Sequence, residues 1–427
     1  MSLNRTLGLT MLTFYGTGMI LGAGIYSIIG QAAGIAGEGL WQGFILAAIC
    51  ALLTALSYAE LASMYPHAGG EYVYLRKAFE SQRWVAGTIG IIMTFAGCAS
   101  AATVALAFSR YLQYFLELPQ FWVASGLLTF FSAINLIGIK QSSWVNVLFT
   151  TIEAFGLILF IWLGWQDPKF GSAIISTPSM ATLSSAALII FAYFGFENIV
   201  NLAEETNNPE KNIPRAIFLS LAISTILYVL VSLAAVALMP PEQLALSASA
   251  LTDASAKSSP KIAGVLAGIA LFSTANTALI ALLTTSRILY GISKDNSLPL
   301  VLSKILVKQK TPWVAAIVAL TVAVLLLKLG KVETIASVAA LTTMTAFVAV
   351  NAAVIALRLK KPAMERAFKV PWAIGTIPVF PILGILTCLI FLTQFDRQIY
   401  LIGALCMTFS FGIYFLYSRY KLRRIEN

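Results

Sequence analysis

The sequence predicts an all-α protein that crosses a membrane about twelve times. Of its 427 residues, 59% are hydrophobic and 11% are charged, whereas an ordinary soluble domain has about 25% charged residues. The mean hydropathy is +0.85. The apolar residues form continuous runs of about 20, the length that a helix needs to cross the hydrocarbon core of a bilayer. The charged residues gather in the segments between these runs.

Twelve apolar runs, each bounded by charged residues, proline or glycine, are predicted to be helices. The first run follows a segment without a small-residue cleavage site, so we expect a retained span rather than a signal peptide. The ninth is at the short limit for a span and the last two pairs are poorly separated, which leaves ten or eleven crossings open. In chain order the predicted spans are 9–34, 40–63, 84–112, 119–138, 144–165, 180–206, 213–239, 261–292, 312–328, 333–358, 375–394 and 398–418.

The positive charges are distributed unequally between the two ends of these spans. An even number of spans places both termini on one side, and 21 of the 28 Lys and Arg residues fall on that side. The other seven are Arg110, Lys169, Lys257, Lys261, Lys328, Lys331 and Arg397. The positive-inside rule therefore predicts a multi-pass protein of the inner or plasma membrane with both termini in the cytoplasm. Because the basic residues follow alternate loops and form no single basic face, the net charge of +10 does not indicate a nucleic-acid partner.

Glycines predict that two of the helices are broken. The first span contains Gly16, Gly18, Gly22 and Gly24 near its middle, a density that weakens a helix and favours an unwound segment. Close helix packing is the alternative explanation for small residues spaced four apart. The sixth span contains Gly195 and an ionisable residue, Glu197, in mid-run.

Interrupted helices at the start of each half are typical of carriers built from inverted repeats. We therefore predict a first repeat over 1–170 (helices 1–5) and a second repeat over 171–360 (helices 6–10). Residues 361–427 would form two further helices and a cytoplasmic tail.

Two broken helices would create a site for a zwitterion. Backbone N–H groups are exposed where a half-helix begins, and carbonyl groups where a half-helix ends. We expect an α-carboxylate on the amides of Ala23, Gly24 and Ile25. The α-ammonium would lie on carbonyls of the segments at Ile20 and at Phe191, Ala192 and Phe194. An amino acid has this charge pattern, so the predicted partners are an amino acid and the lipid bilayer.

Four motifs resemble those of the amino acid–polyamine–organocation (APC) family of carriers. They are GAGIY in the first span, YAELASMYPHAGGEYVYLRKAFE after the second, FAYFGFENIVNLAEETNNPEKNIPRAI across the sixth and SRILYGISKDNSLP after the eighth. The resemblance covers residues 9 to 360. It implies a leucine-transporter-like fold with a 5+5 inverted repeat, broken helices 1 and 6, and two additional C-terminal helices. It also implies exchange or proton-coupled uptake of amino acids or amines, with Phe191 as a gate over the substrate.

The chain departs from many members of that family at Glu153, where they carry a lysine that replaces a sodium ion. A carboxylate can itself load and release a proton, so we interpret Glu153 as the principal proton-coupling group. A hydrogen bond that fixes helix packing is the alternative. Glu197 and, as a neighbour of the ion or proton site, Thr285 are the other candidates. No cofactor is expected, and a proton gradient is the expected driving force.

Other function classes fit the sequence less well. The four cysteines lie singly and His67 is the single histidine, so neither a metal site nor the machinery of an enzyme is expected. A channel is disfavoured because no filter motif is present. The third span presents Thr94, Cys98, Ser100 and Thr103 but no acidic residue, which favours neutral amino acids. Glu197 keeps a cationic amino acid or polyamine transporter open, and an amino acid exchanger also remains an alternative. Glu60 and Glu71 are expected at the membrane interface.

Overall fold

The computed structural model describes residues 3–113, 116–175, 180–247, 249–328 and 332–426. Within these residues, ten helical segments are long and apolar enough to cross a membrane, and Trp313–Leu327 and Val379–Leu392 are shorter apolar helices. In chain order these apolar helices are α1 (Leu9–Ala36), α2 (Leu40–Met64), α4 (Arg83–Gln113), α5 (Gln120–Ile137), α6 (Ile139–Trp165), α7 (Met180–Ile189) with its continuations η4 (Ile190–Tyr193) and η5 (Phe196–Glu205), α8 (Pro209–Leu238), α11 (Pro260–Lys294), α12 (Trp313–Leu327), α13 (Val332–Lys360), α14 (Val379–Leu392) and α15 (Arg397–Glu426).

The prediction of an all-α membrane fold is therefore confirmed. The largest shifts of a single helix end are at α15, which continues to Glu426 rather than 418, and at α6, which begins at Ile139 rather than 144. Polar residues end an apolar run, but a helix can continue past the hydrocarbon because its own backbone bonds remain satisfied. Short elements were not predicted in the connections: η1 (Gly37–Gly39), α3 (Gly70–Ala78), η2 (Pro168–Phe170), η3 (Ser172–Ile175), α9 (Pro241–Leu246), α10 (Ala250–Ser258), η6 (Leu300–Ser303) and the antiparallel pair β1 (Ala373–Ile374) and β2 (Ile377–Pro378).

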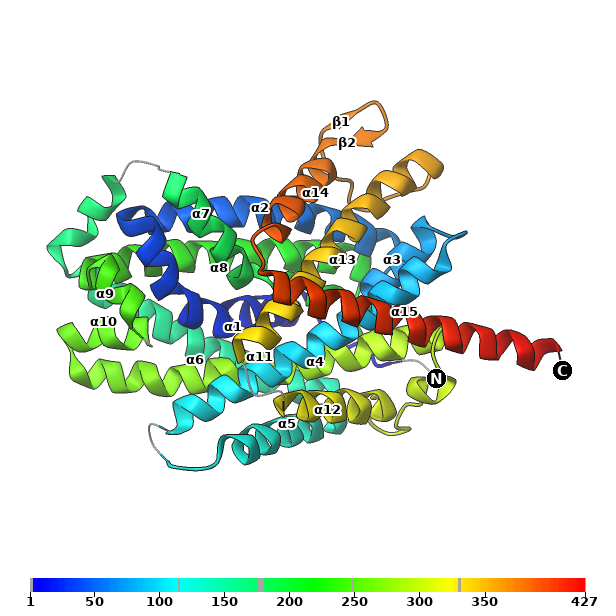
Figure 1. Cartoon of the computed structure of the whole chain (residues 1–427), viewed down its shortest axis with the longest axis horizontal. Helices are drawn as coiled ribbons and strands as arrows, with labels where there is room; N and C mark the ends of the chain where they lie inside the picture. Colours follow the sequence, from blue (N-terminus) through cyan, green and yellow to red (C-terminus); the bar gives the residue numbers. More distant parts are fainter. Residues whose placement is uncertain (1–2, 114–115, 176–179, 248, 329–331, 427) are drawn as a thin grey trace.

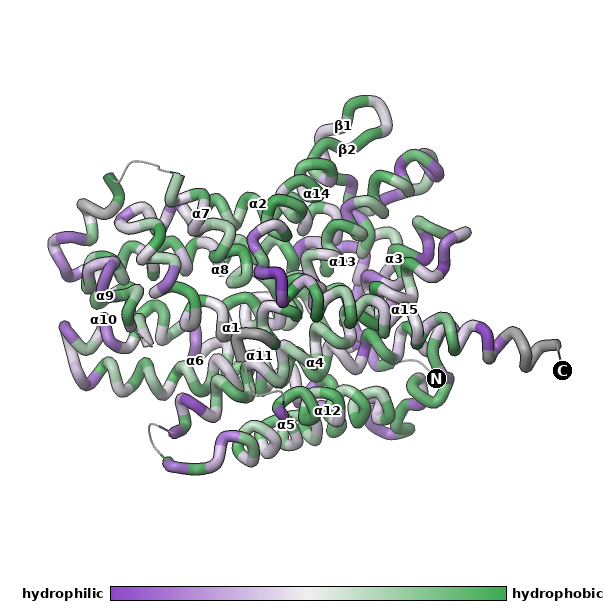
Figure 2. The backbone as a smooth tube through the Cα atoms, viewed as in Figure 1, coloured by the Kyte–Doolittle hydropathy of each residue, from purple (hydrophilic) through white to green (hydrophobic). Residues whose placement is uncertain are grey.

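Both termini lie at one end of the bundle, together with α3, whereas α9 and α10 lie at the opposite end (Figure 1). Hydrophobic residues occupy most of each long helix, and hydrophilic residues are most frequent in the connections (Figure 2). α11 is the most buried span and α15 the most peripheral one among the described residues. The assignment of the terminal end to the cytoplasm stays a prediction from the charge distribution.

Two spans are broken, as the glycines predicted. In α1 the backbone of Gly22 has φ −22° and ψ −142°, which interrupts the helix. In the sixth span Phe194 is extended and Gly195 has φ +134°, a conformation that side-chain-bearing residues rarely adopt. The two breaks meet, because a Cβ atom on Gly195 would lie 2.7 Å from Cγ of Met19.

Equivalent helices of the two predicted halves pack against each other. α2 contacts α8, α4 contacts α11 and α5 contacts α12, so each helix lies against the span five places later. A two-fold repeat would produce such pairs. The division of the chain at 170 and 360 remains a prediction.

Candidate functional site

A cavity of about 370 Å³ lies beside the two helix breaks. It is enclosed by α1, α4, the broken sixth span, α11 and α13. Its size is in the range of small-molecule sites. The lining residues are Met19, Ile20, Gly24, Ile28, Gln31, Met93, Ala96, Gly97, Ser100, Thr103, Val104, Leu188, Phe191, Phe194, Gly195, Glu197, Asn198, Thr277, Ile288, Ala336, Ser337, Ala339, Ala340 and Thr343.

Five of the predicted site residues line this cavity: Ile20, Gly24, Phe191, Phe194 and Glu197. Two others are close to the breaks but lie outside the lining. Ile25 is fully buried, and Ala192 packs against Gly24, where an added Cβ would be 2.9 Å from the Ala192 Cα. The side chain of Ala23 lies outside the described part of the structure.

A tyrosine joins the two breaks from a third helix. The Tyr228 hydroxyl, on α8, donates to the carbonyl oxygen of Ile20 at 2.5 Å and lies 3.1 Å from that of Ala192. The carbonyl of Phe191 accepts from the backbone N–H of Phe194. Two of the carbonyls predicted to bind an ammonium group thus already have protein donors, although each carbonyl oxygen accepts two hydrogen bonds.

Glu197 caps the second half of the broken sixth span. One carboxylate oxygen accepts from the backbone N–H of Gly195 at 2.7 Å, and the other accepts from Nδ2 of Asn198 at 3.0 Å. A carboxylate at the start of a half-helix satisfies N–H groups that have no helical acceptor. Glu197 therefore both lines the cavity and stabilises the conformation of the helix break.

Phe191 lies between the cavity and the loop that joins α14 to α15. Its ring centroid is 5.4 Å from that of Phe194 and 5.9 Å from that of Phe395. Phe395 belongs to a part of the chain outside the two predicted repeats. Any movement of the Phe191 ring would therefore break or displace its contact with Phe395. The gating role of Phe191 stays a prediction.

Glu153 lies one layer behind the cavity wall. It is fully buried on α6, and one of its oxygens accepts from the Ser273 hydroxyl of α11 at 2.5 Å. Its Oε2 atom has no hydrogen-bond partner among the described residues. One turn further along α11, Thr277 lines the cavity and donates to the backbone carbonyl of Ser273. Glu153 is thus linked to the cavity through a single turn of α11.

Thr285 is not part of the same site. It lies twelve residues after Ser273 on α11, a rise of about 18 Å along a helix. Its hydroxyl is buried without a partner among the described residues and lies where a Cβ atom on Gly97 would be. The structure therefore separates Thr285 from Glu153.

The sequence did not reveal most of the cavity wall contributed by α4, α11 and α13. The wall includes Met93, Gly97, Thr277, Ser337 and Thr343. Of the third-span residues that the sequence singled out, Ser100 and Thr103 line the cavity. Thr94 instead donates to Gly90, and Cys98 donates to the carbonyl of Ala319 on α12. The apolar runs carry no signal for which face of each helix turns inward.

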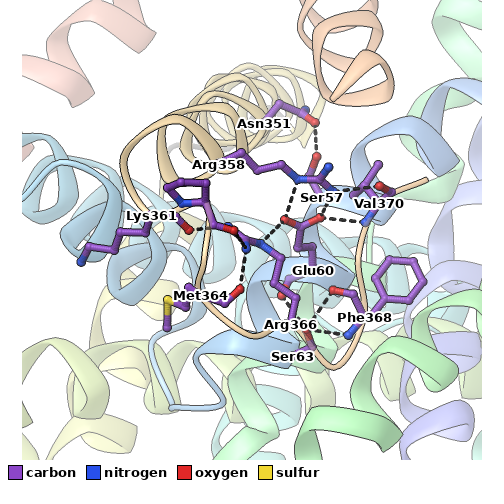
Figure 3. A network of polar contacts seen from close by, with 11 residues as sticks. Ser57, Glu60, Ser63, Asn351, Arg358, Lys361, Met364, Arg366, Phe368 and Val370 are labelled. Carbon is purple, nitrogen blue, oxygen red and sulfur yellow. Dashed lines mark hydrogen bonds and ion pairs between the residues drawn. The ribbon is translucent and has the colours of Figure 1, made fainter. Parts of the chain in front are cut away.

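Glu60 and Glu71, which the sequence placed at the membrane interface, are both buried inside the protein. Glu71 is fully buried on α3, and its carboxylate accepts from the Tyr58 hydroxyl at 3.1 Å. Glu60 is 1% exposed and forms ion pairs with Arg358 and Arg366, two residues that are distant from it in the sequence (Figure 3). Among the residues that the structure describes, no three His, Cys, Asp or Glu side chains are arranged to hold a metal ion.

Comparison with known proteins agrees with this architecture. Residues 7–413 match the family model of the amino acid permeases. The branched-chain amino acid permease BcaP of Bacillus subtilis is 32% identical, over 98% of this chain and 94% of its own length. The methylthioribose transporter of the same organism is 30% identical over the same shares, and the mouse cationic amino acid transporter 4 is 28% identical over 84% of this chain and 61% of its own. The chain belongs to the amino acid permeases of the APC family and is a transporter rather than an enzyme.

Proposed function

We propose that this permease imports neutral amino acids by alternating access, with a proton as the coupled ion. The cavity itself is the main support. Glu197 is the one charged side chain among the described residues that line it, and both of its oxygens already accept hydrogen bonds from the protein. A cationic side chain would therefore find a single carboxylate in the wall, and that carboxylate already holds the helix break.

The rest of the wall suits an apolar substrate side chain. Met93, Val104, Leu188 and Ile288 line it together with several alanines and hydroxyl groups. The Thr103 hydroxyl has no hydrogen-bond partner among the described residues, so it is available to a ligand. Similarity to a branched-chain amino acid permease points in the same direction. A half-helix starts after Gly22, and we assign the substrate carboxylate to the amino-terminal end of this half-helix, at Ala23, Gly24 and Ile25.

Counterflow in proteoliposomes tests the substrate class. Vesicles loaded with unlabelled leucine are expected to accumulate labelled leucine, with isoleucine and valine as strong competitors and lysine and putrescine as weak ones. The same panel includes methylthioribose, because a relative is named for its transport. Counterflow with lysine or putrescine alone would establish the cationic alternative, and conductance without saturation would indicate a channel.

Glu153→Gln tests the coupling. A buried carboxylate that alternates between protonated and charged forms can link a proton to the packing of α6 against α11. The variant is expected to keep leucine counterflow but to lose accumulation driven by an inward proton gradient. Glu197→Gln serves as the comparison on the cavity wall. The assignment to Glu153 fails if its variant still accumulates leucine with the wild-type pH dependence, or if Glu197→Gln alone removes that dependence.

A further inference from the structure

One face of α6 is polar along its buried half. Ser143, Asn146, Thr150 and Glu153 are spaced three or four residues apart, which places them on one side of a helix. None of the four side chains is more than 1% exposed. We call these four residues the α6 polar face. It extends over ten residues, about 15 Å, from Glu153 toward the end of the bundle that carries the termini.

The α6 polar face is hydrogen-bonded to α11. Asn276 donates from Nδ2 to the Thr150 hydroxyl at 2.9 Å and accepts from Nδ2 of Asn146 at 3.0 Å. α1 contributes a glycine at this level: a Cβ atom on Gly18 would collide with Thr150, Asn146 and Asn276. The absence of a side chain at Gly18 lets three helices bring their polar atoms together.

Two acceptors on this face have no partner among the described residues, Oδ1 of Asn146 and Oε2 of Glu153. An unpaired buried acceptor costs about 1–3 kcal/mol, so packing alone would favour apolar residues here. Ordered water is the usual partner of such atoms. The two unpaired oxygens are therefore candidate positions for ordered water.

The far end of the α6 polar face approaches an ion pair. The Ser143 hydroxyl lies 3.5 Å from that of Tyr15 on α1. The charges of Arg287 and Glu205 act on the Tyr15 hydroxyl. These two buried residues form a bidentate pair at 2.8 and 3.0 Å, which closes the α6 polar face at the terminal end in this conformation.

We propose that the α6 polar face is the route by which the proton of Glu153 exchanges with the compartment at the terminal end of the bundle. The inference rests on the proposed proton coupling at Glu153. The proton leaves the carboxyl group for a water molecule, and each following water or hydroxyl accepts one proton as it donates another. One proton is thereby moved and no other bond changes. Asn146 and Asn276 position the water molecules, whereas Thr150, Ser143 and Tyr15 supply hydroxyls to the route.

Other titratable groups near Glu153 enter the design of the test. The hydroxyls of Tyr26 on α1 and Tyr228 on α8 are within its electrostatic reach, and α11 faces it with the hydroxyl of Ser273. Both tyrosines are left unchanged in the variants below, so that their contribution is the same in every sample.

Thr150→Val removes one hydroxyl from the route with little change in shape. We expect leucine counterflow at the wild-type rate, or counterflow of whichever panel member the wild type exchanges fastest. Proton influx linked to that substrate, measured with a pH-sensitive dye inside the vesicles, is expected to fall about tenfold, as for a transfer step raised by about 1.4 kcal/mol. Thr150→Ser is expected to restore it. Thr151→Val is the matched control, because Thr151 is exposed on a different side of the same helix and its hydroxyl donates to a carbonyl within that helix.

The outcomes separate the route from the coupling. Proton influx that falls while counterflow persists supports the route. If Glu153→Gln loses proton influx but Thr150→Val keeps it unchanged, the proposed route is overturned. A parallel fall in counterflow, proton influx and melting temperature also overturns it, because that pattern is the one expected of a packing role. If Glu153→Gln keeps the wild-type influx, the proposed coupling fails and the route fails with it.

Discussion

Gly195→Val is expected to abolish transport while the protein still reaches the membrane. Gly195 has φ +134°, where a residue with a side chain is strained by about 1–3 kcal/mol. A Cβ atom there would also lie 2.7 Å from Cγ and 2.9 Å from the carbonyl carbon of Met19. The two breaks would have to move apart, and Ile20, Gly195 and Glu197 would no longer face the same cavity. Leucine counterflow, normalised to protein recovered as a single peak in detergent, measures the effect.

Gly126→Val provides the control for this substitution. Gly126 is exposed on α5, and a Cβ atom there meets nothing within 4 Å. A normal transport rate is expected. Gly24→Val is a second test from the other break, since its Cβ would lie 2.9 Å from the Ala192 Cα. Wild-type counterflow in a well-folded Gly195→Val or Gly24→Val protein would contradict a site built on the two breaks.

The spans and their breaks could be predicted because their causes are local. A run of apolar residues must be a helix in hydrocarbon wherever its neighbours are. A glycine such as Gly195 weakens a helix by its own backbone freedom. Ile20, Gly24, Phe191 and Phe194 therefore appear both in the prediction and on the cavity wall.

The rest of the site depends on contacts between distant parts of the chain. Tyr228 bridges carbonyls of α1 and η4, although its own surroundings in the sequence are ordinary apolar residues. Thr277 reaches the cavity because Gly22 leaves room for its hydroxyl. Hydropathy alone cannot distinguish an inward face from a lipid face when both are apolar. Only the assembled helices show that Met93 and Gly97 turn toward the cavity.

Glu60 illustrates the same limit for charged residues. Its position at the end of α2 predicted a carboxylate at the membrane interface and gave no sign of its partners, which come from the segment after α13 that folds back over it. The Ser63 hydroxyl holds that segment by accepting from the backbone N–H of Phe368 at 3.2 Å, and the carbonyl oxygen of Phe368 lies 3.3 Å from it. The burial of Glu60 is thus created by residues about 300 positions away.

Glu60→Gln is expected to destabilise the folded protein by about 3–5 kcal/mol, the cost of breaking a buried ion pair by removing one partner. The Glu60 carboxylate accepts from Nε and Nη2 of Arg358 at 3.0 and 2.5 Å, from Nε of Arg366 at 2.9 Å and from the backbone N–H of Val370 at 2.7 Å (Figure 3). Both arginine side chains are no more than 5% exposed. A neutral amide would leave two buried guanidinium groups without a counter-charge.

The melting temperature of the protein in detergent measures this loss, and Glu80→Gln is the matched control. Glu80 pairs with Lys361 at 2.7 Å in the same region, but its side chain is 65% exposed. Solvent screens such a pair, so its loss is expected to change the melting temperature little. The double variant Glu60→Gln with Arg366→Gln removes one of the unpaired guanidinium groups and is expected to recover part of the stability. A Glu60→Gln protein that melts with the wild type, or a double variant less stable than the single one, would show that the arginines are held by other contacts than this carboxylate.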